Sequence, residues 1–352
     1  MDLDEILRIA NPKQLAAIKH PLAPLMIIAG AGTGKTFTLE NRIIYMIQQY
    51  GVKPDSILTI TYTEKAAKEL KSRLHEKIGQ KVHPMFVGTF HSFCYKLMKD
   101  YQINNADSSS LIDQSEAVHM ILENYDDFMP FMSEEYSINP KISVVESFIP
   151  FFNRLRDELV DIDKVDQSIL KDFYKDDAES LDQLNDLLRI FPIYQNLKKE
   201  NNLIDYNDMI LDTFHALKND TRLLEKVQSK YEHLIIDEFQ DNNYALNEIS
   251  RLISKKNRSI TVVGDDDQVI YSFRGANAFN ISTFEKTYES HPNYEMITLE
   301  TNYRSSQPIL DLANHSIKHN KERKVKSLVS AGKNIEIKPI IFKGEKSEQI
   351  EF

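Results

Sequence analysis

The stretch Ala29-Gly30-Ala31-Gly32-Thr33-Gly34-Lys35-Thr36 decides the fold. It follows an apolar run at residues 25–29 and precedes a segment whose apolar residues have helical spacing. Glycine permits the turns that point backbone N–H groups at phosphate oxygens, and a helix N-terminus favours anions. We therefore expect Lys35 to reach the β- and γ-phosphates of a nucleotide and the Thr36 hydroxyl to bind Mg²⁺. An ordinary glycine-rich turn is the alternative, and the usual pattern has glycine in place of Ala29.

A second motif, His233-Leu234-Ile235-Ile236-Asp237-Glu238-Phe239-Gln240-Asp241, combines an apolar run with acidic residues. Open α/β sheets bind their ligands at the carboxyl ends of the strands, where these acids are expected. We expect Asp237 to hold Mg²⁺ and Glu238 to accept a proton from, or to orient, the water that attacks the γ-phosphate. A helix N-cap followed by a first-turn glutamate is the alternative for this pair.

Short apolar runs alternate with helical stretches at both ends of the chain. Runs such as Leu234-Ile235-Ile236 and Thr261-Val262-Val263 are continuously apolar, as in a parallel sheet covered on both faces. Strands separated by helices predict an α/β architecture. Residues 107–205 show no convincing strand, which predicts an inserted helical block. The candidate strands are 25–29, 57–62, 85–89, 233–236, 260–264, 296–299 and 335–343.

The composition is that of a globular chain. Its 352 residues are 41% hydrophobic and 27% charged, enough for roughly two or three domains. The single cysteine, Cys94, cannot form an internal disulfide, which favours a cytoplasmic location. The acidic start lacks the features of a secretory signal, and no uncharged apolar run approaches the roughly 18–20 residues that span a bilayer. We therefore expect no membrane partner.

The net charge of −10 is unevenly distributed along the chain. Residues 157–188 hold eleven acidic residues and three lysines, which accounts for eight of the ten net negative charges. The remainder is nearly balanced and can form a basic groove locally, so net charge does not exclude a nucleic-acid partner. The basic run from Lys318 to Lys326 is interpreted as a solvated helix face, with a binding site as the alternative.

Together with five further segments, the two motifs resemble those of the UvrD/Rep-type superfamily 1 DNA helicases, in the same order. The five segments are Asn11–Gln14, Ile57–Ala67, Gly88–Phe93, Val263–Ala276 and Leu299–Ser305. The resemblance implies a P-loop NTPase (RecA-like) fold with a parallel sheet and an inserted helical subdomain. It implies a first motor domain at 1–106 and 206–285, the insertion at 107–205, and the truncated beginning of a second motor domain at 286–352. The family's later motifs are not found, so we interpret the chain as the N-terminal part of a longer helicase.

The resemblance also implies nucleotide contacts. Gln14 is expected to read the adenine edge, and Tyr303 to stack near it. Gln268 is expected to sense the γ-phosphate or its water, and Arg304 to bring positive charge to the γ-phosphate from the second domain. Arg42 corresponds to a family nucleotide contact. Two alternatives remain open: Asn11–Gln14 forms a good helix start by itself, and Arg42 fits a solvated helix face.

The residues implied for DNA contact are mostly aromatic. Bases stack on such rings for about 1–3 kcal/mol each, regardless of sequence. Taken alone, each aromatic residue also fits a core position. The family usually has Phe where Tyr62 stands and Trp where Phe273 stands, so stacking is expected to be weaker but otherwise similar. The expected DNA-binding residues are Tyr62, His91, Tyr271, Phe273 and Arg274.

The function implied by the resemblance is an ATP hydrolase and DNA helicase that uses ATP and Mg²⁺. It would move 3′ to 5′ on single-stranded DNA, or on a duplex with a single-stranded tail, beside repair or replication proteins. Two other functions remain open. One is an ATP- and DNA-binding module that does not unwind DNA as the isolated chain. The other is a different P-loop ATPase, such as a metabolic kinase, which has no need for the aromatic segment around Tyr271.

Overall fold

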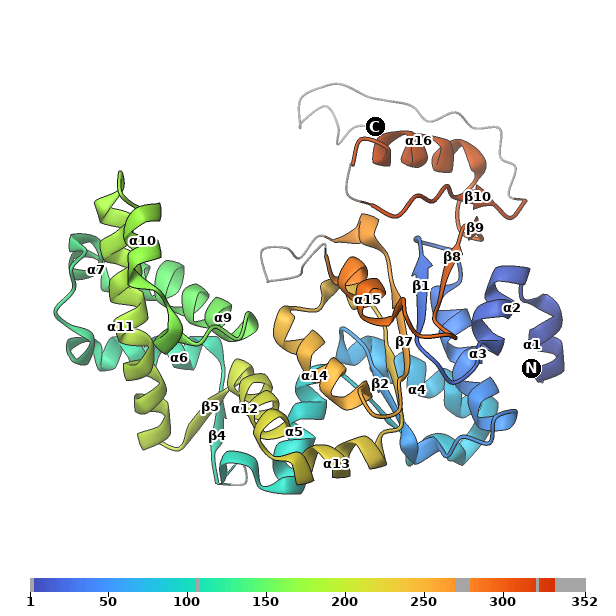
Figure 1. Cartoon of the computed structure of the whole chain (residues 1–352), viewed down its shortest axis with the longest axis horizontal. Coiled ribbons are helices and arrows are strands. Elements are labelled where there is room, and N and C mark those ends of the chain that lie inside the picture. The colour runs from blue at the N-terminus through green and yellow to red at the C-terminus, as the bar shows by residue number, and fades with distance from the viewer. Residues whose placement is uncertain (1–2, 106–107, 270–278, 321–322, 333–352) are drawn as a thin grey trace, which may run out of the picture.

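The computed structural model describes residues 3–105, 108–269, 279–320 and 323–332. At its centre lies a parallel sheet with the strand order β3-β2-β6-β7-β1-β8 (Figure 1). The predicted α/β fold is confirmed, and it is consistent with a RecA-like domain. The strands are β1 (Leu25–Ala29), β2 (Ile57–Ile60), β3 (Phe86–Gly88), β6 (His233–Ile236), β7 (Ser259–Gly264) and β8 (Glu295–Leu299).

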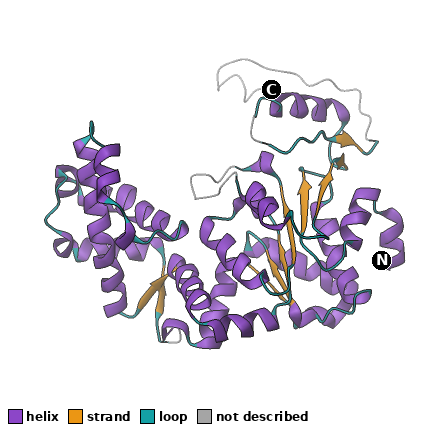
Figure 2. Cartoon of the chain, viewed as in Figure 1, coloured by secondary structure: helices purple, strands orange, loops and turns teal. Residues whose placement is uncertain are grey.

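Helices cover both faces of the sheet (Figure 2). Strand β1 explains why, because its side chains alternate between two hydrophobic cores: Met26 and Ile28 face one, Leu25 and Ile27 the other. The second core is closed by α1 (Leu3–Ile9), α2 (Pro12–Lys19), α3 (Lys35–Gln48) and α4 (Glu64–Ile78). The first core is closed by α5 (Phe90–Tyr101), α12 (Tyr206–Asn219), α13 (Thr221–Lys230), α14 (Tyr244–Ser254) and α15 (Asn280–Tyr288).

A helical insertion lies between α5 and α12 and extends to the left in Figure 1. It has its own aromatic core, in which Phe148, Phe152 and Tyr194 are almost fully buried. Its helices are α6 (Gln114–Glu123), α7 (Glu134–Ile138), α8 (Pro140–Ser143), α9 (Ile149–Asp157), α10 (Gln167–Phe173) and α11 (Ala178–Glu200).

Short helical turns occur throughout the described residues: η1 (Pro54–Ser56), η2 (Gly79–Val82), η3 (Ile103–Asn105), η4 (Tyr125–Phe128), η5 (Val144–Phe148), η6 (Ile162–Lys164), η7 (Phe239–Asp241) and η8 (Asp266–Gln268).

The expectation that residues 107–205 contain no strand is wrong. Strand β4 (Ser110–Ile112) pairs in parallel with β5 (Leu203–Asp205) where the insertion joins the domain that contains the six-stranded sheet. Each strand has only three residues and only part of each is buried, so neither produces an apolar run in the sequence.

A buried ionic cluster holds the same junction together. Lys198 of α11 lies 2.7 Å from Asp205 and 2.5 Å from Asp208, measured from Nζ to the nearest carboxylate oxygen. Arg156 of α9 lies 2.7 Å from Asp205 and 2.9 Å from Asp208, and the Tyr194 hydroxyl donates to Asp205. Both cationic side chains are 2% exposed, so these charges depend on one another for compensation.

The last described part of the chain contains β9 (Thr301–Asn302), α16 (Gln307–Ile317) and β10 (Val329–Ser330), with β10 parallel to β9. The predicted division into domains remains a prediction. One observation bears on its boundary at residue 286: β8 pairs with β1, so the first sheet continues beyond it. The strand predicted at 335–343 lies outside the described residues. Within the described ranges, no helix has the length and apolar character needed to cross a membrane.

Candidate nucleotide-binding site

The glycine-rich stretch forms a loop between β1 and α3. Gly32 and Gly34 have φ angles of 76° and 83°, which side chains disfavour. The Thr33 hydroxyl donates to the Gly30 carbonyl at 2.8 Å and is buried, so it stabilises the loop. Helix α3 begins at Lys35, and its N-terminus therefore faces the loop. A loop of this shape, with a helix N-terminus behind it, is suited to bind phosphate.

Lys35 and Glu238 meet across the carboxyl edge of the sheet. The Lys35 ammonium donates to Glu238 Oε1 at 2.7 Å and to Oε2 at 2.6 Å. Strand β7 lies between β1 and β6, and because all three strands are parallel their carboxyl ends share one edge. The expected juxtaposition of the phosphate loop and the acidic motif is therefore present. The catalytic and binding roles assigned to these residues remain predictions.

Asp237 sits directly after β6 and is largely enclosed by protein. Its backbone N–H donates to the Ile60 carbonyl, and its Oδ1 accepts from the Glu238 backbone N–H at 3.0 Å. Burial, reinforced by the charge of Glu238, raises the pKa of Asp237 to about 6, although Lys35 opposes the shift. None of the described residues forms an ion pair with Asp237, and the exposed Thr36 hydroxyl stands at the start of α3. Both side chains offer oxygen atoms, the type of ligand that Mg²⁺ prefers. The residues therefore fit the expected metal.

Gln14 closes the other side of the loop. It forms the predicted capping box with Asn11: its backbone N–H donates to Asn11 Oδ1 and its Oε1 accepts from the Asn11 N–H. Its Nε2 also donates to the Thr33 carbonyl at 3.1 Å, and a side chain on Gly34 would collide with it. Tyr303 is next to this corner, because its hydroxyl accepts from Asn11 Nδ2 at 2.9 Å. The two residues expected to contact adenine thus share one end of the loop, and that role remains a prediction.

The segment that follows β8 lies against the phosphate loop. Asn302 donates from Nδ2 to the Ala31 carbonyl at 2.6 Å, and the Tyr303 N–H donates to the Gly32 carbonyl at 2.8 Å. An added Cβ on Gly32 would lie 2.7 Å from the Cβ of Arg304, which places this exposed arginine beside the loop. Asn302 was not among the expected site residues, although it lies inside the motif that contains Tyr303 and Arg304.

A cavity of about 400 Å³ opens beside the two acids, and Tyr62 and Gln268 line it with Asp237 and Glu238. Gln268 donates from Nε2 to Asp265 Oδ2 at 2.5 Å. The cavity therefore brings a residue expected to sense the γ-phosphate together with one expected to contact DNA.

Gln240 links the acidic motif to the turn that carries Gln268. Its side chain donates to Glu238 Oε2 at 2.9 Å and accepts from the backbone N–H of Asp265 at 3.0 Å. It is buried, and a Cβ on Gly264 would lie 2.7 Å from its Oε1, so Gly264 leaves room for it. Neither Gln240 nor Asp265 was expected to have a role, although both belong to the motifs quoted above.

Arg42 is neither the nucleotide contact nor the solvated helix residue that was expected. Its guanidinium is fully buried and donates to the side chain of Thr261 and to three backbone carbonyls, those of Ala17, His20 and Pro21. A group whose donors are used inside the protein is neither a nucleotide contact nor a solvated face. It ties α2 and α3 to β7, and helical periodicity alone could not reveal this.

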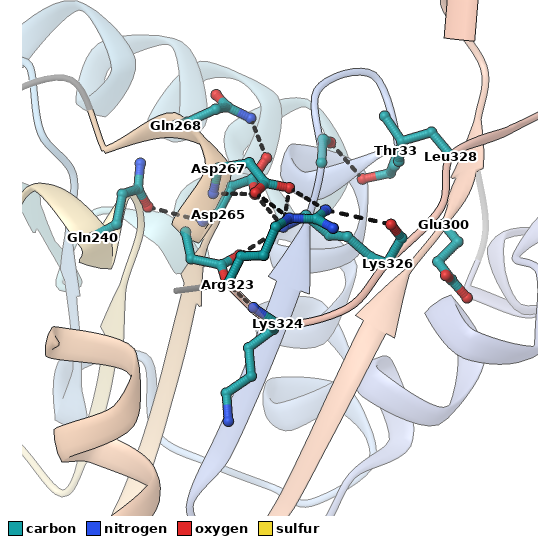
Figure 3. A network of polar contacts seen from close by, with 12 residues as sticks. Thr33, Gln240, Asp265, Asp267, Gln268, Glu300, Arg323, Lys324, Lys326 and Leu328 are labelled. Carbon is teal, nitrogen blue, oxygen red and sulfur yellow. Dashed lines mark hydrogen bonds and ion pairs between the residues drawn. The ribbon is translucent and has the colours of Figure 1, made fainter. Parts of the chain in front are cut away.

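The basic run also differs from the prediction of a solvated helix face. Arg323 and Lys326 follow α16 in an extended segment and form ion pairs with Asp265, Asp266 and Asp267 (Figure 3). Only 3% of the Lys326 side chain is exposed. The acidic partners lie far away in the sequence, so no local pattern could have indicated the pairing.

The expected DNA contacts are only partly described. Tyr62 is 37% exposed. His91 lies in the first turn of α5 and makes an edge contact with Tyr206, and burial lowers its pKa. Tyr271, Phe273 and Arg274 lie outside the described residues. All DNA contacts therefore remain predictions.

Comparison with known proteins agrees with this arrangement. The family model of the UvrD/REP helicase N-terminal domain matches residues 10–289. The ATP-dependent DNA helicase PcrA of Staphylococcus aureus (strain Mu50) is 33% identical over 334 residues, covering 94% of this chain and 43% of the relative. PcrA of Staphylococcus epidermidis (strain ATCC 12228) is 33% identical over 331 residues, covering 94% of this chain and 42% of the relative. The chain thus spans less than half the length of these curated relatives. The matched region contains the phosphate loop, the acidic motif and the turn with Gln268, and the chain belongs to the UvrD/REP helicase family.

Proposed function

We propose that the chain is the ATP-binding part of a motor that hydrolyses ATP and moves along single-stranded DNA. The observation that carries the proposal is the contact between Lys35 and Glu238 at the carboxyl edge of the sheet, with Asp237 beside it. Family membership supports it, since the two relatives cited above carry the name ATP-dependent DNA helicase. Movement from 3′ to 5′, a cytoplasmic location and repair or replication partners belong to the same proposal.

The chemistry begins with an exchange of partners at Lys35. The β- and γ-phosphates of ATP bind to the loop N–H groups and to the Lys35 ammonium, competing with Glu238 for it. Glu238, released from Lys35, accepts a proton from the water that attacks the γ-phosphorus. The bond from the γ-phosphorus to the bridging oxygen breaks, and ADP leaves with that oxygen's negative charge.

Mg²⁺ would be held by Asp237 and Thr36, and when bound it neutralises charge on the β- and γ-oxygens. Arg304 lies beside Gly32 and adds positive charge at the phosphates. Gln268 contacts the γ-phosphate or its water from the neighbouring turn. Gln268 shares its cavity with Tyr62, an expected DNA contact. When the contacts of Gln268 with the nucleotide form and break, the contact of Tyr62 with DNA changes as well, and this change produces motion.

The experiment is a measurement of ATP turnover by this chain with and without single-stranded DNA, together with binding of both ligands. Strong stimulation by DNA supports the motor. Binding of both ligands without turnover would indicate a binding module, and turnover indifferent to DNA would indicate another type of P-loop ATPase.

Lys35→Ala is the decisive variant for this experiment. It should abolish turnover, since it removes the ammonium that binds the phosphates. Lys255→Ala, an exposed lysine after α14, is the matched control and should behave as the unmodified chain. Full activity of Lys35→Ala would exclude the loop from the mechanism.

A further inference from the structure

An extended strap, defined as residues 323–330, connects two sides of the candidate site. Its first half lies on the turn η8, where Arg323 forms two hydrogen bonds with Asp267, from Nε to Oδ1 and from Nη2 to Oδ2, both at 2.7 Å (Figure 3). The backbone N–H of Lys324 donates to Asp266. The strap therefore contacts the turn that carries Gln268 through both side chains and backbone.

The second half of the strap reaches the phosphate loop. Leu328 covers Gly30 so closely that an added Cβ there would lie 2.8 Å from Leu328 Cδ2. Strand β10 of the strap pairs with β9, whose Asn302 donates to the Ala31 carbonyl. The strap thus contacts both the phosphate loop and the turn η8, whose Gln268 is expected to sense the γ-phosphate.

Lys326 is the centre of the contact with the turn. Its ammonium lies 2.8 Å from Asp265 Oδ1, 2.6 Å from Asp266 Oδ1 and 2.6 Å from Asp267 Oδ2. The three carboxylates have oxygens within 4.8 Å of one another, close enough to share a cation, and in this structure the lysine supplies the charge. Without it, three carboxylates at this spacing repel one another.

Asp265 transmits this arrangement to Gln268. Its carboxylate has three partners: Oδ1 faces Lys326 and accepts from the Asp267 backbone N–H at 3.1 Å, and Oδ2 accepts the Gln268 side-chain amide at 2.5 Å. Its backbone N–H is fixed by Gln240, which also donates to Glu238. The rotation of the Asp265 carboxylate therefore sets the position of the Gln268 amide, and Lys326 sets that rotation together with the Asp267 N–H.

The charges of the cluster support one another. Burial alone favours the neutral form of Asp267, but hydrogen bonds from Arg323 and Lys326 outweigh it and lower the pKa of Asp267. Burial likewise favours the neutral form of Lys326. The hydrogen bonds to its three carboxylate partners outweigh this effect of burial and raise the pKa of Lys326. Turn and strap are thus held together by full charges.

We infer that Lys326 is a positioning residue for nucleotide sensing: through Asp265 it holds Gln268 in the orientation that distinguishes ATP from ADP. The inference rests on the proposed function, since it takes Gln268 as the residue that contacts the γ-phosphate. Lys326 itself does not touch the nucleotide. Its removal should therefore affect the discrimination between nucleotides and leave the binding of the diphosphate intact.

The test is equilibrium binding of ADP and of a non-hydrolysable ATP analogue, each with Mg²⁺, to the full chain. Lys326→Ala should lower the affinity ratio of analogue to ADP about tenfold, the value of one charge-assisted hydrogen bond, with ADP affinity unchanged. Gln268→Ala should lower the ratio by a similar factor, and the double variant should lower it no further, because the two residues act in series.

Two matched variants complete the design. Lys324→Ala lies in the same strap, but its ammonium pairs with Glu285, so it should keep the ratio of the unmodified chain. Lys326→Arg keeps the charge, so a folded Lys326→Arg chain should recover most of the ratio. Should Lys326→Ala unfold the chain, Lys326→Gln, which keeps the side-chain length but loses the charge, takes its place alongside Lys326→Arg.

An unchanged ratio in a folded Lys326→Ala or Lys326→Gln chain would overturn the inference. Equal losses of affinity for ADP and the analogue would also overturn it, because they indicate a structural role only. Failure of the proposed function looks different, since the unmodified chain would then bind neither nucleotide or would not distinguish them.

Discussion

The backbone of Glu238 has a φ of 51°, a left-handed conformation that residues other than glycine rarely adopt. Such a conformation costs about 1–3 kcal/mol and persists only where the surroundings enforce it. Here Lys35 and Gln240 both bind its carboxylate. Strained residues concentrate at functional sites, and this one occupies the position at which a base for ATP hydrolysis is expected.

We predict that Glu238→Gln retains nucleotide binding but loses turnover by about 10²–10⁴-fold, because the amide cannot accept a proton from water. The measurement is a single-turnover hydrolysis rate, with nucleotide affinity determined in parallel. Glu248→Gln, on helix α14, serves as the control and should retain the full rate. A Glu238→Gln variant that hydrolyses ATP at the rate of the unmodified chain would remove Glu238 from the chemistry.

We expect nucleotide binding to depend on pH through Asp237. Its pKa of about 6 leaves much of it protonated near pH 6, and Mg²⁺ requires the ionised form. Binding of the Mg²⁺–ATP analogue should therefore release about half a proton from this group at pH 6 and almost none at pH 8. Calorimetry in two buffers of different ionisation enthalpy measures the release.

Asp237→Asn provides the reference for that measurement, because protons released by the nucleotide itself remain in the variant. The difference in proton release between the unmodified chain and Asp237→Asn isolates the contribution of this carboxyl. Equal release by the two proteins at pH 6 would contradict the prediction.

At the scale of single elements, the junction between α11 and α12 depends on compensation of buried charge. Lys198→Met would leave Asp205 and Asp208 with Arg156 as their remaining cationic partner. We expect it to lower the free energy of unfolding by about 3–5 kcal/mol, as for other broken buried ion pairs. Urea unfolding measures the loss.

The adjacent Lys199 is exposed and offers a matched control, since Lys199→Met changes the same side chain on the same helix. Its free energy of unfolding should change by no more than about 0.5 kcal/mol. Similar unfolding curves for the two variants would show that the ionic cluster contributes little.

The sequence was most informative where a pattern is local. Strands β1 and β6 have the predicted bounds, because buried strands of a parallel sheet are continuously apolar. The capping box of Asn11 and Gln14 is likewise a local motif. Strands β4 and β5 were missed, because three-residue strands lack the alternation that marks longer ones.

Long-range contacts explain most of what the sequence left open in the candidate site. Arg42 has helical spacing compatible with an exposed face, and only tertiary packing shows that its partners are backbone carbonyls and Thr261. Lys326 has acidic partners 59 to 61 residues earlier in the chain, and nothing nearby in the sequence indicates them. Charge compensation of this kind can be recognised only after the chain has folded.

At the scale of the whole molecule, the domain with the six-stranded sheet and the helical insertion have separate hydrophobic cores. A nucleotide at the proposed site would contact β1, β6 and β7 through their loops, and the strap through the phosphate loop. Binding stabilises the parts of a protein that form the site, by about 2.7 kcal/mol at a ligand concentration one hundred times Kd.

We therefore predict that the ATP analogue with Mg²⁺ slows amide hydrogen exchange in the sheet loops and in residues 323–330, with little effect on α6–α11. Hydrogen exchange followed by mass spectrometry measures this directly. ADP should protect the phosphate loop but the strap less, since it lacks the group that Gln268 senses. Protection confined to the insertion would contradict the placement of the site.

The pairing of Lys35 with Glu238 also has a consequence for the timing of ATP hydrolysis. Both carboxylate oxygens of Glu238 accept from Lys35, so in the proposed mechanism Glu238 turns to the attacking water only after the phosphates of ATP have replaced it on Lys35. Binding of ATP would thus release the carboxylate that takes part in its hydrolysis. In the proposed mechanism, the lysine that binds ATP also keeps Glu238 occupied until the triphosphate is bound, so a loosely held nucleotide is not cleaved prematurely.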